Sequence, residues 1–269
     1  MDDQYQDYIT PSITTLQEYI DSYVDTEECN EKIIDDFTAE TNKVPQLKAH
    51  RDYIEHQNKI KIIGHGDRCL HHMWKLIVDT LPKEFNFLEI GVYKGQILSL
   101  IQMLAEHAGK NPKIVGVTPL VDPSYVKYNR LPYIEQLYEQ FSLTMSNTTI
   151  LDGLSQDENI INQVYDLAPF DVVYVDGDHS YKATVADIKN FDKCLKIGGY
   201  LVVDDASIYK NMPSHKFSGI AEVSDAVRDT LEKDSRYVDL LTCMHVRIFR
   251  KVKEFKDDIS DEDFWDEMW

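Results

Sequence analysis

Residues Phe170–Ser207 read FDVVYVDGDHSY, KATVADIKNFDKCLK and IGGYLVVDDAS, and they contain two apolar runs that each end in acidic residues. The first run, Phe170–Val175, has the Val, Tyr and Phe content of a strand buried on both faces. The second run is Tyr200–Val203. Between them, over residues 182–196, apolar side chains recur at helical spacing. The segment therefore predicts two parallel strands joined by a helix.

Carboxylates follow both of these predicted strands: Asp176 and Asp178 after the first, Asp204 and Asp205 after the second. In open α/β sheets the carboxyl ends of parallel strands form the edge at which ligands bind. One Asp after a strand is most often a turn or cap residue. Two acidic strand ends that flank one crossover favour a functional site, because converging carboxylates repel unless a cation or hydrogen bonds separate them. Hard oxygen ligands suit Mg²⁺ or Mn²⁺.

The composition indicates a globular protein with a small ligand. The chain has 269 residues and 43% hydrophobic content, enough for one large α/β domain with an appendage. A net charge of −19 argues against nucleic-acid and anionic-membrane partners. The four cysteines are scattered without a CxxC pair, and the start lacks the features of a signal peptide. We therefore expect a cytoplasmic protein.

The first 84 residues show no strand pattern, and we expect them to form a helical cap over the carboxyl edge of the sheet. One helical face is predicted from Ile13, Leu16, Ile20 and Val24. Further helices are predicted around Phe37, around Leu47 and after Asp67. Three histidines in this region are candidate metal ligands, although a surface or core role is commoner: His65, His71 and His72.

Residues 85–252 supply the other predicted strands. We expect these at Phe85–Ile90, Lys113–Val117, Thr148–Leu151, Tyr237–Leu241 and His245–Phe249, with helices at Gln96–His107, from Pro132 and over Ile220–Lys233. The polar loop Ser207–Gly219 is predicted to fold over the site. The acidic and aromatic tail 253–269 is predicted to be disordered or to bind a partner.

Four motifs now stand in order on successive strand ends: FLEIGVYKG, ILDGLSQD, VYVDGDHSY and YLVVDDAS. Together they resemble the class I S-adenosylmethionine-dependent methyltransferases over about residues 60–250. The resemblance is strongest to the metal-dependent O-methyltransferases, such as catechol O-methyltransferase and the macrocin-type sugar O-methyltransferases. It implies a Rossmann-like α/β fold, a doubly wound seven-stranded sheet with a reversed last strand.

The resemblance also implies the cofactor site. The glycine-rich motif that holds the methionine part corresponds to Glu89, Gly91, Val92, Tyr93 and Gly95, and Asp176 lies beside it. The segment that contacts the adenine corresponds to Gly153, Ser155 and Gln156. Thr118 stands where the family has an acid for the ribose hydroxyls, with Asp122 nearby, so this chain departs from the family there.

By the same resemblance, the metal ligands are Asp176, Asp204 and Asp205, of which the last is Asn in the catechol enzyme. Two residues are candidates for the general base, His179 and Asp178. A cation lowers the pKa of a bound hydroxyl, and a base with a pKa near neutrality then takes its proton. We favour His179, since an Asp beside a cation is a poor base at neutral pH.

The sequence therefore predicts an S-adenosylmethionine- and Mg²⁺-dependent (or Mn²⁺-dependent) O-methyltransferase acting on a small hydroxylated molecule, with a sugar or glycan as the first choice. Two alternatives stay open: the same fold turned to hydroxylation or hydrolysis, and a non-catalytic cofactor-binding scaffold. A nicotinamide dehydrogenase is disfavoured, because the motif is E-x-G-x-x-x-G rather than G-x-G-x-x-G. The N-terminal region is expected to serve as a lid or as the contact of a homo-oligomer.

Overall fold

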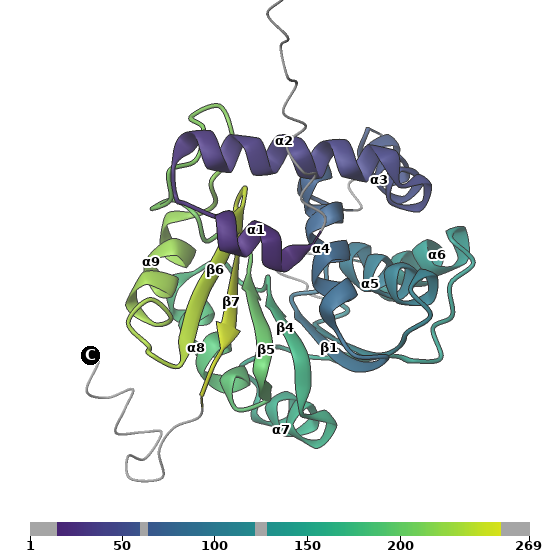
Figure 1. The fold of residues 1–269 in the computed structure, drawn as a ribbon. Helices are drawn as coiled ribbons and strands as arrows, with labels where there is room; N and C mark the ends of the chain where they lie inside the picture. Colours follow the sequence, from purple (N-terminus) through teal and green to yellow (C-terminus); the bar gives the residue numbers. More distant parts are fainter. Residues whose placement is uncertain (1–14, 60–63, 122–127, 254–269) are drawn as a thin grey trace, which may run out of the picture.

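A computed structural model of the chain describes residues 15–59, 64–121 and 128–253. Seven strands form one mixed sheet in the order β3-β2-β1-β4-β5-β7-β6 (Figure 1). Their bounds are Glu84–Ile90 (β1), Asn111–Thr118 (β2), Thr148–Asp152 (β3), Phe170–Val175 (β4), Leu195–Val203 (β5), Tyr237–Cys243 (β6) and Val246–Lys251 (β7). The predicted α/β class and the seven-stranded sheet are confirmed.

The strand directions bring the acidic strand ends together. Strands β1 to β5 pair in parallel, whereas β7 lies antiparallel between β5 and β6. The chain order reverses between β1 and β4, which are neighbours in the sheet. Ligands of doubly wound sheets bind outside the carboxyl ends of the strands at such a reversal point.

Two layers of helices cover the sheet, because successive strand residues face opposite sides. In β4, Val172 and Tyr174 belong to one hydrophobic cluster, and Val173 and Val175 belong to the other. The first cluster includes residues of Arg68–Thr80 (α4), Gln96–His107 (α5) and Leu131–Gln140 (α6). The second includes residues of Glu158–Leu167 (α7), Tyr181–Asp192 (α8) and Ala221–Asp229 (α9). The reading of β4 as a strand buried on both faces is confirmed.

Before β1 the described chain is helical, as predicted. Leu16–Ser22 (α1), Glu27–Lys43 (α2) and Pro45–Asn58 (α3) precede α4, and α2 runs across the end of the sheet at which β5 terminates (Figure 1). The Asn30 amide of α2 donates to the Asn211 carbonyl at 2.9 Å, which ties the cap to the loop after β5. None of the described helices is long and apolar enough to cross a membrane.

Several predicted boundaries were wrong, and one of them is the helix predicted over Ile220–Lys233, which ends at Asp229. Val24 lies outside α1 and is 59% exposed, because the helix begins at the Thr15 capping box and ends at Ser22. The helix predicted over 182–196 ends at Asp192, because the Phe170 amide donates to the Cys194 carbonyl at 2.7 Å and the pairing of β5 begins there. His245 precedes β7 instead of opening it.

Helix α7 had no counterpart among the predicted elements. Some predictions fall outside the described residues: the helix start at Ile13, the acid Asp122 and most of the acidic tail, residues 254–269.

Candidate active site

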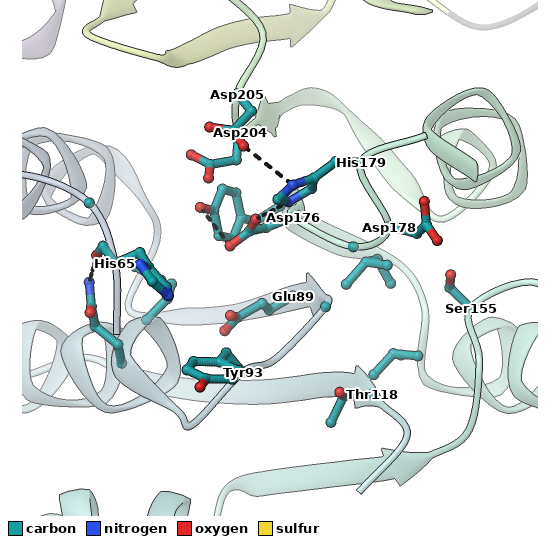
Figure 2. A pocket seen from close by; sticks show the side chains of 18 of the residues that line it. His65, Glu89, Tyr93, Thr118, Ser155, Asp176, Asp178, His179, Asp204 and Asp205 are labelled. Carbon is teal, nitrogen blue, oxygen red and sulfur yellow. Dashed lines mark hydrogen bonds and ion pairs between the residues drawn. The ribbon is translucent and has the colours of Figure 1, made fainter. Parts of the chain in front are cut away.

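A cavity of about 1090 Å³ opens at the carboxyl edge of the sheet. It exceeds the usual volume of a site for one drug-sized ligand, so it has room for a cofactor and a small second molecule. Most of the predicted site residues line it: Glu89, Gly91, Tyr93, Thr118, Gly153, Ser155, Gln156, Asp176, Asp178, His179, Asp204 and Asp205. The structure thus brings together residues from the ends of the five parallel strands, β1 to β5 (Figure 2).

Two predicted residues shape this cavity without lining it. The Val92 side chain is fully buried in the hydrophobic cluster that includes α5. Gly95 begins α5 with a φ of +82°, and a Cβ atom there would lie 3.0 Å from the Ile134 side chain. A glycine is required at this position, because an L side chain rarely adopts this φ. These two residues therefore set the path of the turn.

Glu89 is a buried acid at the end of β1, with only 3% of its surface exposed. Its Oε2 atom has no hydrogen-bond partner among the described residues. Burial, and next the charge of Asp176, raise its pKa well above the usual value. A buried acceptor without a donor is costly. The position therefore fits a ligand that brings a cationic donor.

Thr118 ends β2, at the position where the resemblance implies an acid for the ribose hydroxyls. The Arg130 guanidinium donates a hydrogen bond to the Thr118 hydroxyl, and it also donates to the Val92 carbonyl at 3.2 Å. Both residues line the cavity. The sequence reading missed Arg130, which stands just before α6. This part of the cavity therefore holds a guanidinium group beside the threonine.

Gln156 stands between the cavity and a buried acid. Its Nε2 donates to Ser155 Oγ at 2.7 Å and to Asp187 Oδ1 at 2.9 Å. Asp187 in α8 is fully buried, which raises its pKa to about 7. The sequence reading missed Asp187, although an acid on the apolar stripe of a helix was a signal.

Three carboxyl groups meet where β4 and β5 end. Burial, and next the charges of Asp176 and Asp205, raise the pKa of Asp204 well above its usual value. Burial raises the pKa of Asp205 to about 6. Asp176 accepts a hydrogen bond from the Tyr174 hydroxyl at 3.3 Å. The described residues offer no hydrogen-bond donor to Asp204 Oδ1. Such a cluster favours a bound cation or bound protons.

His179 lies between two of these carboxylates. Its Nε2 is 3.6 Å from Asp176 Oδ1, and its Nδ1 is 3.5 Å from Asp205 Oδ2 (Figure 2). The neighbouring Asp176 carboxylate is the main cause that raises the His179 pKa. Asp178 differs, because its carboxylate points away from this group (Figure 2) and accepts from the Ser180 amide at 2.7 Å. That contact lowers the Asp178 pKa.

The sequence reading missed His245, a residue that is 4% exposed and lines the same cavity. Its Nε2 is 3.5 Å from Asp204 Oδ1. Burial lowers its pKa, so the ring is neutral at pH 7. Topology was the available signal: β7 runs antiparallel beside β5, so the residue before β7 lies at the edge where β5 ends.

The three N-terminal histidines separate into two environments. His65 lines the cavity, and its ring centroid is 5.8 Å from that of Tyr93, but it lies apart from the carboxylates (Figure 2). His71 is buried and lies 2.9 Å from His50, nitrogen to nitrogen. His72 is buried against the Phe37 ring. His71 and His72 are therefore core residues.

Comparisons with known proteins agree with this architecture. Residues 88–206 match a protein family described as a methyltransferase domain. An uncharacterised protein of Acanthamoeba polyphaga mimivirus is 29% identical over 161 residues, which are 58% of this chain and 67% of that protein.

Two solved structures share the fold. The SAH-bound methyltransferase of Podospora anserina aligns with a TM-score of 0.56 and 15% identity, over 83% of this chain and 97% of that one. A putative O-methyltransferase of Klebsiella pneumoniae aligns with a TM-score of 0.53 and 12% identity, over 76% and 90%. The matched region, the strand order and the cavity at the carboxyl edge agree: residues 88–206 are similar to methyltransferase domains, and the chain has the fold that these two solved structures share.

Proposed function

We propose that the protein is an O-methyltransferase that methylates a hydroxyl group of a small molecule with the help of a divalent cation. One observation carries the proposal: a single cavity is lined by the glycine turn with Glu89, whose buried Oε2 has no partner among the described residues, and beside them by the group of Asp176, His179, Asp204 and Asp205. A methyl donor and a hydroxyl acceptor need such adjoining subsites.

The cofactor end fits S-adenosylmethionine, which supplies an electrophilic methyl group when bound. Glu89 would accept a hydrogen bond from its amino group, which would satisfy the unpartnered Oε2. Tyr93 would border the methionine part, and Thr118 with Arg130 would face the ribose hydroxyls. Gly153, Ser155 and Gln156 would border the adenine, with Gln156 held by Asp187.

The acidic end fits a divalent cation such as Mg²⁺ or Mn²⁺, bound by Asp176, Asp204 and Asp205. The support is the donor set of hard carboxylate oxygens, with one buried oxygen of Asp204 that has no partner in the described chain. A cation there would stabilise the ionised carboxylates and lower the pKa of an acceptor hydroxyl. The raised pKa values of Asp204 and Asp205 are the expected state of these groups without such a charge.

His179 is the proposed general base. Its imidazole lies between Asp176 and Asp205, so it borders the position at which an acceptor hydroxyl would meet the cation. A proton taken by the ring is stabilised by these two carboxylates. Asp178 is the weaker candidate, because its carboxylate caps the turn before α8. His179 would therefore take the proton directly from the acceptor hydroxyl, and no other side chain would need to relay it.

A sugar, free or within a glycan, is the proposed acceptor class. The sequence resemblance to sugar O-methyltransferases is the main support. Phe217, which is 51% exposed, lines the cavity next to His245 and offers an aromatic face to the apolar face of a sugar ring. Acidic side chains beside it can accept hydrogen bonds from sugar hydroxyls.

The test is a calorimetric titration of S-adenosylhomocysteine into the protein, with Mg²⁺ and again with chelator. We expect micromolar binding, followed by methyl transfer to hydroxylated acceptors, sugars first, that stops in chelator. Cofactor binding without methyl transfer to any of the hydroxylated acceptors would contradict the O-methyltransferase assignment. No binding in either buffer would mean that the fold has been kept for other chemistry or for a scaffold.

A further inference from the structure

We propose that His245 is a nitrogen ligand of the divalent cation at Asp204 and Asp205, and that it makes the site prefer a first-row transition metal such as Mn²⁺, Fe²⁺ or Co²⁺ over Mg²⁺. The inference rests on the cation of the proposed function and deepens it. It starts from the arrangement of donors: one ligand atom each from Asp204, Asp205 and His245 lie within 4.8 Å of one another.

The spacing of the donors fits shared coordination. His245 Nε2 and Asp204 Oδ1 are 3.5 Å apart. Two ligand atoms that each lie about 2.1 Å from one cation are separated by about 3.0 to 3.5 Å when the angle between them is octahedral or tetrahedral. A direct hydrogen bond between a ring nitrogen and a carboxylate would be shorter. The separation is therefore compatible with two ligands of one cation.

His245 is a buried imidazole whose hydrogen bonds are incomplete. Its Nδ1 has no partner in the described part of the chain, and Asp204 Oδ1, which faces its Nε2, also has none. Another buried histidine, His50, has partners for both ring nitrogens. Its Nδ1 lies 2.9 Å from His71 Nε2, and its Nε2 lies 3.0 Å from the Ser99 hydroxyl oxygen. A cation between His245 Nε2 and Asp204 Oδ1 would give that carboxylate oxygen the partner that the described chain does not supply.

The backbone fixes the His245 ring at this place. The turn from β6 to β7 passes through Met244 at a φ of +57°, and the His245 carbonyl accepts from the Ala206 amide at 2.8 Å. The Phe217 ring lies 5.3 Å from the imidazole, centroid to centroid. Because Ala206 and Phe217 hold His245 in place, its imidazole is pre-organised, and little conformational entropy is lost when a cation binds.

The chemistry of the donor decides the metal. Mg²⁺ prefers oxygen ligands and retains its waters, whereas imidazole suits Fe, Ni, Cu and Zn. Three carboxylates with one imidazole form a mixed site in which the nitrogen adds more affinity for Mn²⁺ and the later metals than for Mg²⁺. Removing His245 should therefore weaken Mn²⁺ binding far more than Mg²⁺ binding.

The test uses the full chain stripped of metal by chelator. Calorimetry gives the Mn²⁺ and Mg²⁺ affinities, and electron spin-echo modulation of bound Mn²⁺ reports coupling to a ligating nitrogen. We expect nitrogen coupling in the wild type and in His179→Ala. We expect its loss in His245→Ala and His245→Gln, with Mn²⁺ affinity reduced about tenfold or more and Mg²⁺ affinity changed about threefold at most.

Thermal unfolding in chelator checks that both variants fold. Labelling the wild-type histidines with ¹⁵N changes the coupling pattern if an imidazole ligates, and this measurement needs no variant. Mn²⁺ binding without nitrogen coupling, or coupling that disappears in His179→Ala, would overturn the role of His245 and leave the proposed function standing. Absence of binding by either metal would overturn both the inference and the metal dependence, while cofactor binding would test the methyltransferase independently.

Discussion

Gly91 and Asp176 are in close contact across the β1–β4 pair: a Cβ atom on Gly91 would lie 1.9 Å from the Asp176 carbonyl oxygen. The Asp176 amide also donates to the Ile90 carbonyl at 2.9 Å. The turn proposed for the cofactor and the acid proposed for the cation therefore form one rigid unit. A change on one side of this contact should disturb both subsites.

Gly91→Ala is the first prediction. Gly91 has a φ of +98°, and the added methyl group would push against the backbone of Asp176. We expect a loss of unfolding free energy of about 3 kcal/mol or more, from the strained φ and the overlap together, with loss of S-adenosylhomocysteine binding. Chemical denaturation and calorimetry measure the two effects.

The matched control for this change is Gly109→Ala. Gly109 also has a positive φ, +65°, but no described atom lies within 4 Å of its Cβ position. We expect a cost of about 1 kcal/mol and normal cofactor binding. Equal costs for the two variants would show that the contact with Asp176 is unimportant.

Glu89→Gln tests the buried acid. A neutral amide keeps the size of the side chain but loses the charge that would face a cofactor amino group. We expect the Kd of S-adenosylhomocysteine to rise about tenfold or more, which corresponds to about 1.4 kcal/mol. Glu84→Gln, an exposed change at the start of the same strand, should leave the Kd within about twofold. A normal Kd for Glu89→Gln would remove Glu89 from the cofactor site.

His179→Ala tests the base. Loss of a general base typically lowers turnover by about 100- to 10,000-fold, so we expect kcat to fall in this range. The Kd of S-adenosylhomocysteine should change about threefold at most, because His179 stands at the acidic end. Asp178→Ala is the comparison, since its carboxylate points away from the group (Figure 2), and it should keep most of the activity. A larger loss for Asp178→Ala would reverse the assignment.

Asp204→Ala should abolish metal binding and activity together. The variant removes a buried carboxyl group whose raised pKa reflects burial and the charges of Asp176 and Asp205. Titration with Mn²⁺ and assays in chelator measure the effect. Activity that persists in this variant and ignores chelator would disprove the metal proposal.

Asp187→Asn should change the stability of the protein by an amount that depends on pH. Burial raises the Asp187 pKa from 3.8 to about 7, so the folded protein holds this proton more tightly than the unfolded chain does. The stability that Asp187 contributes is present below pH 4 and is lost as the pH rises toward 7. Asn stays neutral and keeps an acceptor for Gln156.

The difference in Tm between Asp187→Asn and wild type should therefore grow from pH 4 to pH 8, by the equivalent of about 1 to 3 kcal/mol. Thermal unfolding at several pH values measures it. A difference in Tm that is constant with pH would mean that Asp187 ionises normally.

Local sequence accounts for most of the fold. The apolar run Phe170–Val175 matches β4, and the helical spacing at Gln96–His107 matches α5. Hydrophobic periodicity encodes these elements directly. It failed at the end of α8, where pairing of Leu195 with Phe170 overrides local spacing. Pairing partners are distant in the sequence, so a local pattern does not contain them.

The sequence by itself determined that the carboxylates lie together at the strand ends, because the last residues of parallel strands lie at one edge of the sheet. Only the tertiary structure decided which side chains from other segments contact the predicted site residues. His245 comes from the hairpin turn beside β5, Asp187 from a buried helix face, and Arg130 from the start of α6. Each contact joins segments that are far apart along the chain, so packing and strand pairing, rather than local propensity, bring them together.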